Sequence, residues 1–236
     1  MNKALNLSKL ILVLILWLFL SIINTPTLAL SSDWVFNDKS KVRLISSKNS
    51  VDNVNEIVLG LEYELEPGWK TYWKSPGGGG FPQKIIWDNS TNIKDITIDW
   101  PTPKEFEILG LSSLGYEDKV IFPLLVKLYD SNKTTVVNLN TNYLVCKDIC
   151  IPGNANLLLE IQPGTGEYSE FFHEIEKTRS LLPIENINLS SLYKLDTKIE
   201  KYSDKIEIKV IAESDSSFIN TNIFLHTPFG LPVVKP

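Results

Sequence analysis

The sequence predicts an all-β protein, an antiparallel β-sandwich followed by a connecting helix and an incomplete second β unit. Apolar residues alternate with polar ones from Glu56 to Glu66, which is typical of a half-buried strand. Turn residues separate nearly all the later short apolar runs, and no helical period appears before residue 165. Many short strands without intervening helices indicate a sandwich with antiparallel pairing.

The first 29 residues have the pattern of a signal peptide. Lys3 and Lys9 supply a positive end, and the apolar run 10–23 that follows is too short to span a bilayer comfortably. Small residues precede a cleavage point that we expect after Ala29, and an uncleaved membrane anchor is the alternative. Export would place the chain in a compartment that permits disulfide bonds.

The charge of the chain argues against binding to nucleic acid. The sequence carries 23 basic and 28 acidic residues, a net charge of −5. Loss of residues 1–29 removes two lysines and no acid, which leaves 21 basic and 28 acidic residues and a net charge of −7. An acidic exported chain is a poor partner for a polyanion. No later apolar stretch approaches the length of a transmembrane helix.

The sandwich is expected to occupy residues 30–164. In the first clear strand the apolar side chains point one way, and Glu62, Glu64 and Glu66 are expected to form a solvated face. The run Ser75–Pro82 contains four glycines and predicts a loop. Further strands are expected at Trp69–Lys74, Lys84–Trp87, Ile96–Trp100, Val120–Tyr129, Thr135–Cys146 and Ala155–Ile161.

A helix is predicted at about Tyr168–Leu182, where apolar residues recur on one side and Pro183 ends the pattern. It belongs to a helical connector at 165–188. Alternation returns at Lys205–Ala212 and Thr221–His226. We expect residues 189–236 to be the start of a second β domain that is truncated, because so few strands make only a marginal core.

The only two cysteines, Cys146 and Cys150, are four positions apart. On a helix their β-carbons would be about 5–6 Å apart, beyond the roughly 3.8 Å that a disulfide prefers. On either side of a three-residue hairpin loop, opposed positions approach to about 4.5–5.5 Å, and a small adjustment closes the bond. Cys146 has the parity of Asn138, Asn140 and Asn142, which predicts that it emerges on the less buried face of its strand.

Three interpretations of the cysteine pair remain open on spacing alone: a redox pair, a structural disulfide and a metal site. Closing a loop of about five residues contributes only about 2 kcal/mol, little for a structural disulfide. Short loops also tend to strain the bond and make it easier to reduce. A Cu(I) site would need a third ligand, and only His173 and His226 are available once the leader and its methionine are removed. Common hydrolase and phosphate-loop signatures are absent.

Five segments together resemble the amino-terminal periplasmic domain of DsbD-type protein-disulfide reductases, including the ScsB-like branch. The resemblance covers roughly residues 32–163. The segments are Pro67-Gly-Trp-Lys-Thr-Tyr-Trp-Lys-Ser-Pro-Gly77, Trp100-Pro-x-Pro-Lys-x-Phe106, Gly115-Tyr-Glu-Asp118, Phe122-Pro123 and Tyr143-Leu-Val-Cys-Lys-Asp-Ile-Cys-Ile-Pro152. It implies an immunoglobulin-like sandwich with protein-disulfide reductase activity and no cofactor or metal.

The resemblance also implies roles for individual residues. Cys150 would attack the disulfide of a partner, and Cys146 would resolve the mixed disulfide. Phe106, after Glu105, stands where the family has an aromatic cap over the cysteines, and Tyr72 resembles an aromatic that lines the same site. Core packing is the alternative role for Phe106 and Tyr72.

The family implies a periplasmic electron relay. A membrane-embedded thiol transporter would be the donor, and thioredoxin-like or disulfide isomerase proteins would be the clients. The transporter and the carboxy-terminal thioredoxin-like domain of full-length family members are missing from this sequence, so we expect either a stand-alone module or a truncated gene product. A non-catalytic binding module with a structural disulfide and a Cu(I)-binding envelope protein are the competing functions.

Overall fold

The computed structural model describes residues 30–108, 110–183, 194–215, 217–218 and 222–226. The signal peptide predicted for residues 1–29 lies outside these ranges, and so do residues 184–193 and 227–236 of the predicted connector and second unit. In the part of the chain that is described, no helix has the length and apolar character needed to cross a membrane.

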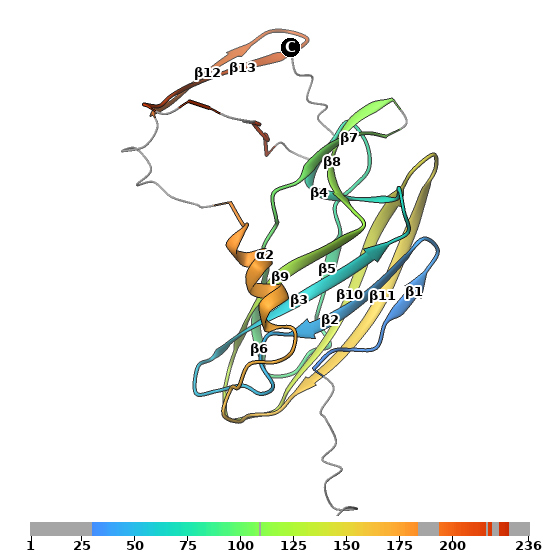
Figure 1. The fold of residues 1–236 in the computed structure, drawn as a ribbon, viewed down its shortest axis with the longest axis vertical. Coiled ribbons are helices and arrows are strands. Elements are labelled where there is room, and N and C mark those ends of the chain that lie inside the picture. The colour runs from blue at the N-terminus through green and yellow to red at the C-terminus, as the bar shows by residue number, and fades with distance from the viewer. Residues whose placement is uncertain (1–29, 109, 184–193, 216, 219–221, 227–236) are drawn as a thin grey trace, which may run out of the picture.

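Two antiparallel sheets form the body of the molecule (Figure 1). One sheet has the strand order β1-β2-β3-β9-β6, and the other has the order β11-β10-β4-β8-β7 with β5 paired to β10. This arrangement confirms the predicted all-β antiparallel sandwich. The strands are β1 (Val35–Asn37), β2 (Ser40–Ser46), β3 (Glu56–Leu65), β4 (Lys70–Gly77), β5 (Lys84–Ile86), β6 (Ile93–Ile98), β7 (Lys104–Ile108), β8 (Leu111–Glu117), β9 (Lys119–Leu128), β10 (Thr135–Cys146) and β11 (Cys150–Ile161).

Alternate residues of the central strands meet in the core between the sheets. Along β10 buried positions alternate with half-buried asparagines, as the sequence predicts. The rings of Phe122 and Tyr143 pack edge-on against Tyr63, and the Tyr63 hydroxyl lies 2.8 Å from the Thr141 hydroxyl. The core therefore joins the two sheets through aromatic packing and a satisfied polar contact.

The expected solvated glutamate face of β3 is wrong at Glu62. This side chain is 0% exposed, and its carboxylate lies 2.6 Å from the Arg43 guanidinium and 2.6 Å from the Lys119 ammonium. A buried charge requires such partners. The strand alternation places Glu62 correctly on the outer face, but it gives no sign that another element covers that face.

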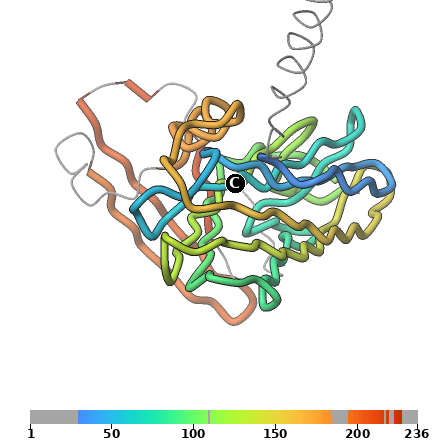
Figure 2. Tube along the Cα trace, turned by 90° about the horizontal axis from the view of Figure 1, so that it is seen from below, coloured from blue at the N-terminus to red at the C-terminus, as the bar shows by residue number. Residues whose placement is uncertain are grey.

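The covering element is α2 (Phe172–Ser180), which is shorter than the predicted helix. Its buried Ile175 packs with Ile45 and Ile121 of the outer sheet face, and its Glu174 pairs with Lys119 at 3.1 Å. Figure 2 shows the orange helix outside the blue strands. The helix is thus packed onto the sandwich, through both apolar contact and the charge cluster around Glu62.

Several element bounds differ from the predictions. β4 runs through Gly77 into the predicted loop, with a register irregularity between Tyr72 and Gly77. The β7–β8 hairpin was not predicted as strands, because its sequence lacks a long apolar alternation. A two-stranded sheet, β12 (Lys194–Lys201) and β13 (Ile206–Glu213), follows α2, and the predicted strand at 221–226 is not a strand in its described residues 222–226.

Candidate functional site

The turn between β10 and β11 positions the two cysteines. Cys146 and Cys150 are direct partners in the strand register, and the Lys147 amide donates a 3.0 Å hydrogen bond to the Ile149 carbonyl across the loop. The Cα atoms are 4.1 Å apart, and a disulfide joins the two residues. The predicted hairpin arrangement is therefore confirmed, and it places the disulfide at the end of the longest strand pair.

Cys146 lies on the asparagine face of β10, as its parity predicts, but at this position that face is buried. The Cys146 residue is 0% exposed, whereas the asparagines on the same face are half-buried. Tyr72 from β4 and Ile108 from β7 form a small apolar cluster with it, and Phe106 and Leu144 pack against this cluster. The β7–β8 hairpin, which sequence reasoning did not identify, covers this end of the sheet face.

Cys150 has the opposite environment. The residue is exposed, and the neighbouring Ile149 is 61% exposed. The Tyr72 hydroxyl lies 3.9 Å from the Cys150 Sγ. Burial raises the pKa of Tyr72, so near neutral pH this phenol is protonated and able to donate to sulfur. One end of the disulfide is thus accessible to another protein, and the other end is sealed inside the fold.

The glycine run fixes the Tyr72 ring. Gly80 has φ +82°, and a β-carbon at this position would lie only 2.2 Å from the Cζ of Tyr72. Only glycine both tolerates this backbone conformation and leaves room for the ring. The sequence predicts the loop correctly, but its contact with the site could not be found because no pattern connects a glycine run to a particular tyrosine.

Phe106 and Glu105 lie on opposite faces of β7, because successive side chains of a strand alternate. Phe106 is half-buried against the cluster around Cys146. Glu105 is exposed, and its carboxylate accepts a 2.9 Å hydrogen bond from the Ser112 hydroxyl. The structure therefore brings Phe106 and Tyr72 together with the disulfide, and it does not bring Glu105 into that cluster.

Sequence reasoning missed Lys70. This residue pairs with Cys146 in the β4–β10 register, and its ammonium lies 5.2 Å from the centroid of the Phe106 ring. On the other side of β4, Lys70 pairs with Glu117 of β8. A hydrogen bond from Lys104 at 2.6 Å lowers the pKa of Glu117. The proximity of Lys70 to the cysteines depends on strand pairing, which sequence spacing cannot reveal.

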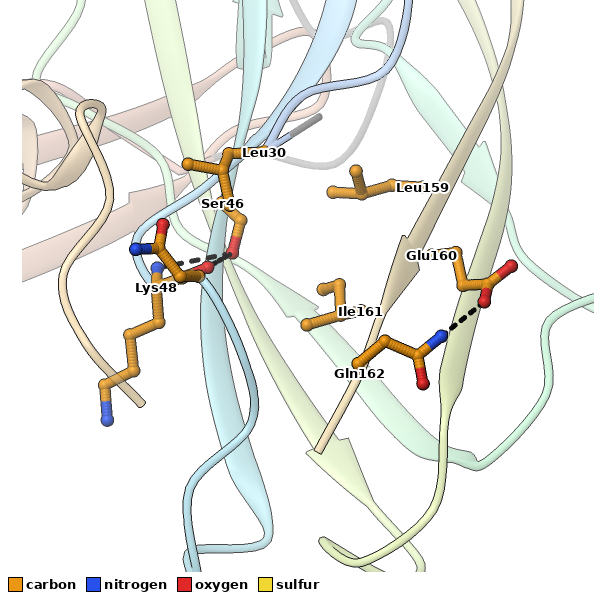
Figure 3. A pocket seen from close by; sticks show the side chains of 8 residues that line it. Leu30, Ser46, Lys48, Leu159, Glu160, Ile161 and Gln162 are labelled. Carbon is orange, nitrogen blue, oxygen red and sulfur yellow. Dashed lines mark hydrogen bonds between the residues drawn. The ribbon is translucent and has the colours of Figure 1, made fainter. Parts of the chain in front are cut away.

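Other parts of the described chain offer less chemistry. Across these residues, no three or more His, Cys, Asp or Glu side chains gather in an arrangement that could hold a metal ion. His173 lies on α2, and the His226 ring lies 6.5 Å from that of Trp73. A pocket at the far end of β11, lined by residues that include Leu30, Ser46 and Ile161, contains neither cysteine (Figure 3).

Comparisons with known proteins identify a family and a similar fold. The family model described as "Thiol:disulfide interchange protein DsbD, N-terminal" matches residues 42–161. The crystal structure of the N-terminal periplasmic domain of ScsB from Proteus mirabilis is 23% identical, with a TM-score of 0.55, and the match covers 79% of this chain and 86% of that chain. The reduced N-terminal domain of DsbD from Neisseria meningitidis is 12% identical, with a TM-score of 0.31 and coverage of 53% and 86%. No curated protein sequence matches.

The likeness to the ScsB domain extends the family match beyond sequence to the fold. It covers more of the chain than the family model does. The immunoglobulin-like β-sandwich expected from the sequence is therefore confirmed.

Proposed function

The chain belongs to the family of DsbD amino-terminal thiol:disulfide interchange domains, and from this premise we propose that it relays electrons in the periplasm. Its general activity is thiol–disulfide exchange. In the proposed relay, a membrane-embedded thiol transporter supplies the electrons. Thioredoxin-like or disulfide isomerase proteins receive them, which makes the chain a protein-disulfide reductase module.

The contrast between the two cysteines carries this proposal. Cys150 is exposed at the rim, whereas Cys146 is fully buried beneath aromatic side chains. Thiol–disulfide exchange proceeds by attack of a thiolate on one sulfur of a disulfide, and access decides which sulfur reacts. A structural disulfide has no need of one accessible end, whereas an exchange site requires it.

Reduction of the domain then takes two steps. A thiolate of the donor attacks Cys150 Sγ, so the bond between the cysteines breaks, a mixed disulfide forms and Cys146 leaves as a thiolate. The second donor thiolate attacks the donor sulfur of that mixed disulfide, which releases the donor in its oxidised form and leaves both cysteines reduced. One electron pair has moved from donor to domain.

Delivery to the client is the reverse chemistry. The Cys150 thiolate attacks the client disulfide, and one client sulfur leaves as a thiolate. Cys146 then attacks Cys150 Sγ, which re-forms the internal disulfide and releases the client as a dithiol. In this scheme Phe106 and Tyr72 shield Cys146 between encounters, because together with the β7–β8 hairpin they cover it.

Trapping of the mixed disulfide tests the proposal. In Cys146→Ser, the attacking Cys150 lacks its resolving partner, so we expect a stable covalent complex with an oxidised thioredoxin-like protein, visible on a non-reducing gel and dissolved by reductant. The matched control is Cys150→Ser, which keeps the buried Cys146 and should trap little or nothing. Equal trapping by both variants would contradict the roles assigned to the two cysteines.

A structural disulfide would behave differently. The wild-type bond would resist reductants that open other oxidoreductases, and Cys146→Ser would form no covalent complex. Those two results together would replace electron transfer with a binding module whose bridge only shapes the hairpin.

A further inference from the structure

Opening the disulfide creates a charge in a buried place. Whenever the bond breaks at Cys150, Cys146 becomes a thiolate, yet Cys146 is 0% exposed and sits among Tyr72, Ile108 and Leu144. Burial disfavours the charged form of a thiol and would raise its pKa, slowing every step that forms or uses the thiolate. The site therefore needs a positive group close to this sulfur.

Lys70 occupies the required position. It is opposite Cys146 in the β4–β10 register, and side chains at opposed positions of an antiparallel pair share one face with β-carbons about 5 Å apart. Its ammonium donates a 3.1 Å hydrogen bond to the Gly68 carbonyl and lies over the Phe106 ring. These contacts hold the charge at the rim, beside the cluster that surrounds Cys146.

Lys147 brings a second ammonium to the same turn. Its Nζ lies 3.1 Å from the point where a β-carbon on Gly68 would stand. The ammonium groups of Lys70 and Lys147 therefore both lie beside Gly68. Within the described chain, neither forms an ion pair with a carboxylate within 4.0 Å.

The nearest acidic group in the strand register is Glu117, and Lys70 is, after Lys104, one of the charges that lower its pKa. Glu117, the other strand neighbour of Lys70, is bound by Lys104 at 2.6 Å. Asp148 is exposed in the hairpin loop, and Glu105 and Glu107 are on the opposite face of β7. In the disulfide state neither ammonium group has a carboxylate within 4.0 Å among the described residues, and the Cys146 thiolate would supply a closer negative charge.

We propose that Lys70, assisted by Lys147, is a positioning residue that stabilises the Cys146 thiolate released when the disulfide opens. The inference rests on the exchange function proposed above. It adds a residue from β4, outside the cysteine hairpin, to the reaction. The same charge would favour the reduced form of the pair, because only that form places a negative sulfur beside the two lysines.

Titration of Cys146 in the Cys150→Ser background tests the proposal without any partner protein. We expect Lys70→Met to raise the apparent pKa of Cys146, read from the ultraviolet absorbance of its thiolate, by about one unit, since a nearby opposite charge shifts a pKa by about 1–3 units. Well below that pKa, this corresponds to about tenfold less thiolate. Lys70→Arg should stay close to the parent protein because it keeps the charge.

Lys84→Met is the matched control. Lys84 lies on β5 and pairs with Asn142 of the same strand β10, so it is about 13 Å along that strand from Cys146. That separation exceeds the Debye length of about 10 Å at 0.1 M salt, and its removal should leave the titration unchanged. Lys147→Met should raise the apparent pKa of Cys146 by less than Lys70→Met does. It provides a second test of the proposal if Lys70→Met does not fold.

The dependence of the exchange rate on pH distinguishes a positioning role of Lys70 from a purely structural one. In the protein with both cysteines, Lys70→Met should slow the attack of Cys146 on the mixed disulfide by about threefold at neutral pH, because a tenfold smaller thiolate fraction is partly offset by a more nucleophilic thiolate. The rate should recover as the pH rises through the shifted pKa of Cys146. A structural role would lower the rate equally at all pH values. An unchanged Cys146 titration in Lys70→Met, or an equal shift in Lys70→Arg or Lys84→Met, would overturn the inference. Failure to trap a partner would count against the proposed function but leave this titration valid.

Discussion

The sandwich and the β12–β13 hairpin both have strands in which apolar and polar residues alternate, but only the sandwich buries its apolar residues. In the sandwich, alternate residues of β3 and β10 are buried between two sheets. In β12 and β13, no residue is buried, although one face of the hairpin is mostly apolar. The residues of that face are Leu195, Thr197, Ile199, Lys201, Ile206, Ile208, Val210 and Ala212. Alternation therefore assigns a residue to a face, but burial requires a second layer to cover it.

The presence of a second layer also matters for the disulfide, which lies at the turn between β10 and β11. The β10–β11 pair packs one face against the core along its length, and Cys150 lies at its exposed loop end. A hairpin with no second layer, such as β12–β13, could not hold Tyr72 and Phe106 over one sulfur while exposing the other. A rigid frame with one open rim is what a protein that must dock and exchange requires.

The largest expected effect is the loss of a core side chain. Leu139→Ala removes a fully buried residue of β10 and should lower the free energy of unfolding by about 2–5 kcal/mol. Ile199→Ala on β12, a residue 58% exposed, should change it by less than about 0.5 kcal/mol. Urea denaturation followed by tryptophan fluorescence measures both. A large loss in Ile199→Ala would mean that another layer covers the hairpin in solution.

A smaller effect is expected at the buried carboxylate. Glu62→Gln keeps the shape but leaves Arg43 and Lys119 without their counter-charge, which should cost about 2 kcal/mol of unfolding free energy. The control in the β12–β13 hairpin is Glu200→Gln. Glu200 pairs with exposed Lys198 at 2.5 Å, and loss of this ion pair should have no measurable effect on the free energy of unfolding. The same urea experiment compares the two.

If Glu62→Gln proved as harmless as Glu200→Gln, solvent would have to reach the cluster beneath α2. The helix would then be loosely attached rather than packed. Protection of the amide of Ile175 from hydrogen exchange, which should fall in Glu62→Gln, gives an independent measure of that attachment.

The sequence was sufficient for those parts of the fold that depend on local pattern. Alternation identified β3 and β10, and loop length identified the cysteine hairpin. The burial of Glu62 and Cys146 could not be predicted, because each is covered by an element distant in sequence: α2 in one case and the β7–β8 hairpin in the other. Parity reports which face a residue occupies and contains no information about what packs on it.

The same reasoning explains the site residues. Phe106 and Tyr72 were identified through motifs that resemble a family, and they do lie at the cluster around Cys146. Glu105 was grouped with Phe106 by sequence adjacency, although neighbouring residues on a strand point in opposite directions. Lys70 was overlooked because its only link to Cys146 is the pairing of β4 with β10, which forms when the chain folds.

The smallest loss of stability expected within the sandwich is at Phe106, near the exposed cysteine loop. Phe106 is half-buried against the cluster around Cys146, so Phe106→Ala should cost only about 1 kcal/mol of unfolding free energy. Its effect on reactivity should be larger. Removal of the ring exposes the buried Cys146 end of the disulfide and frees the ammonium of Lys70, and reduction by a small dithiol should accelerate by about tenfold, equivalent to about 1.4 kcal/mol of barrier.

Leu195→Ala on β12 is the control for this rim effect, since it also removes an apolar side chain that is not buried. It should change neither the unfolding free energy nor the reduction rate, followed by the loss of the disulfide form on a non-reducing gel after quenching. An unchanged rate in Phe106→Ala would mean that the ring does not limit access to the disulfide. Tyr72 and the glycine loop that fixes it would then provide the shielding without help from β7.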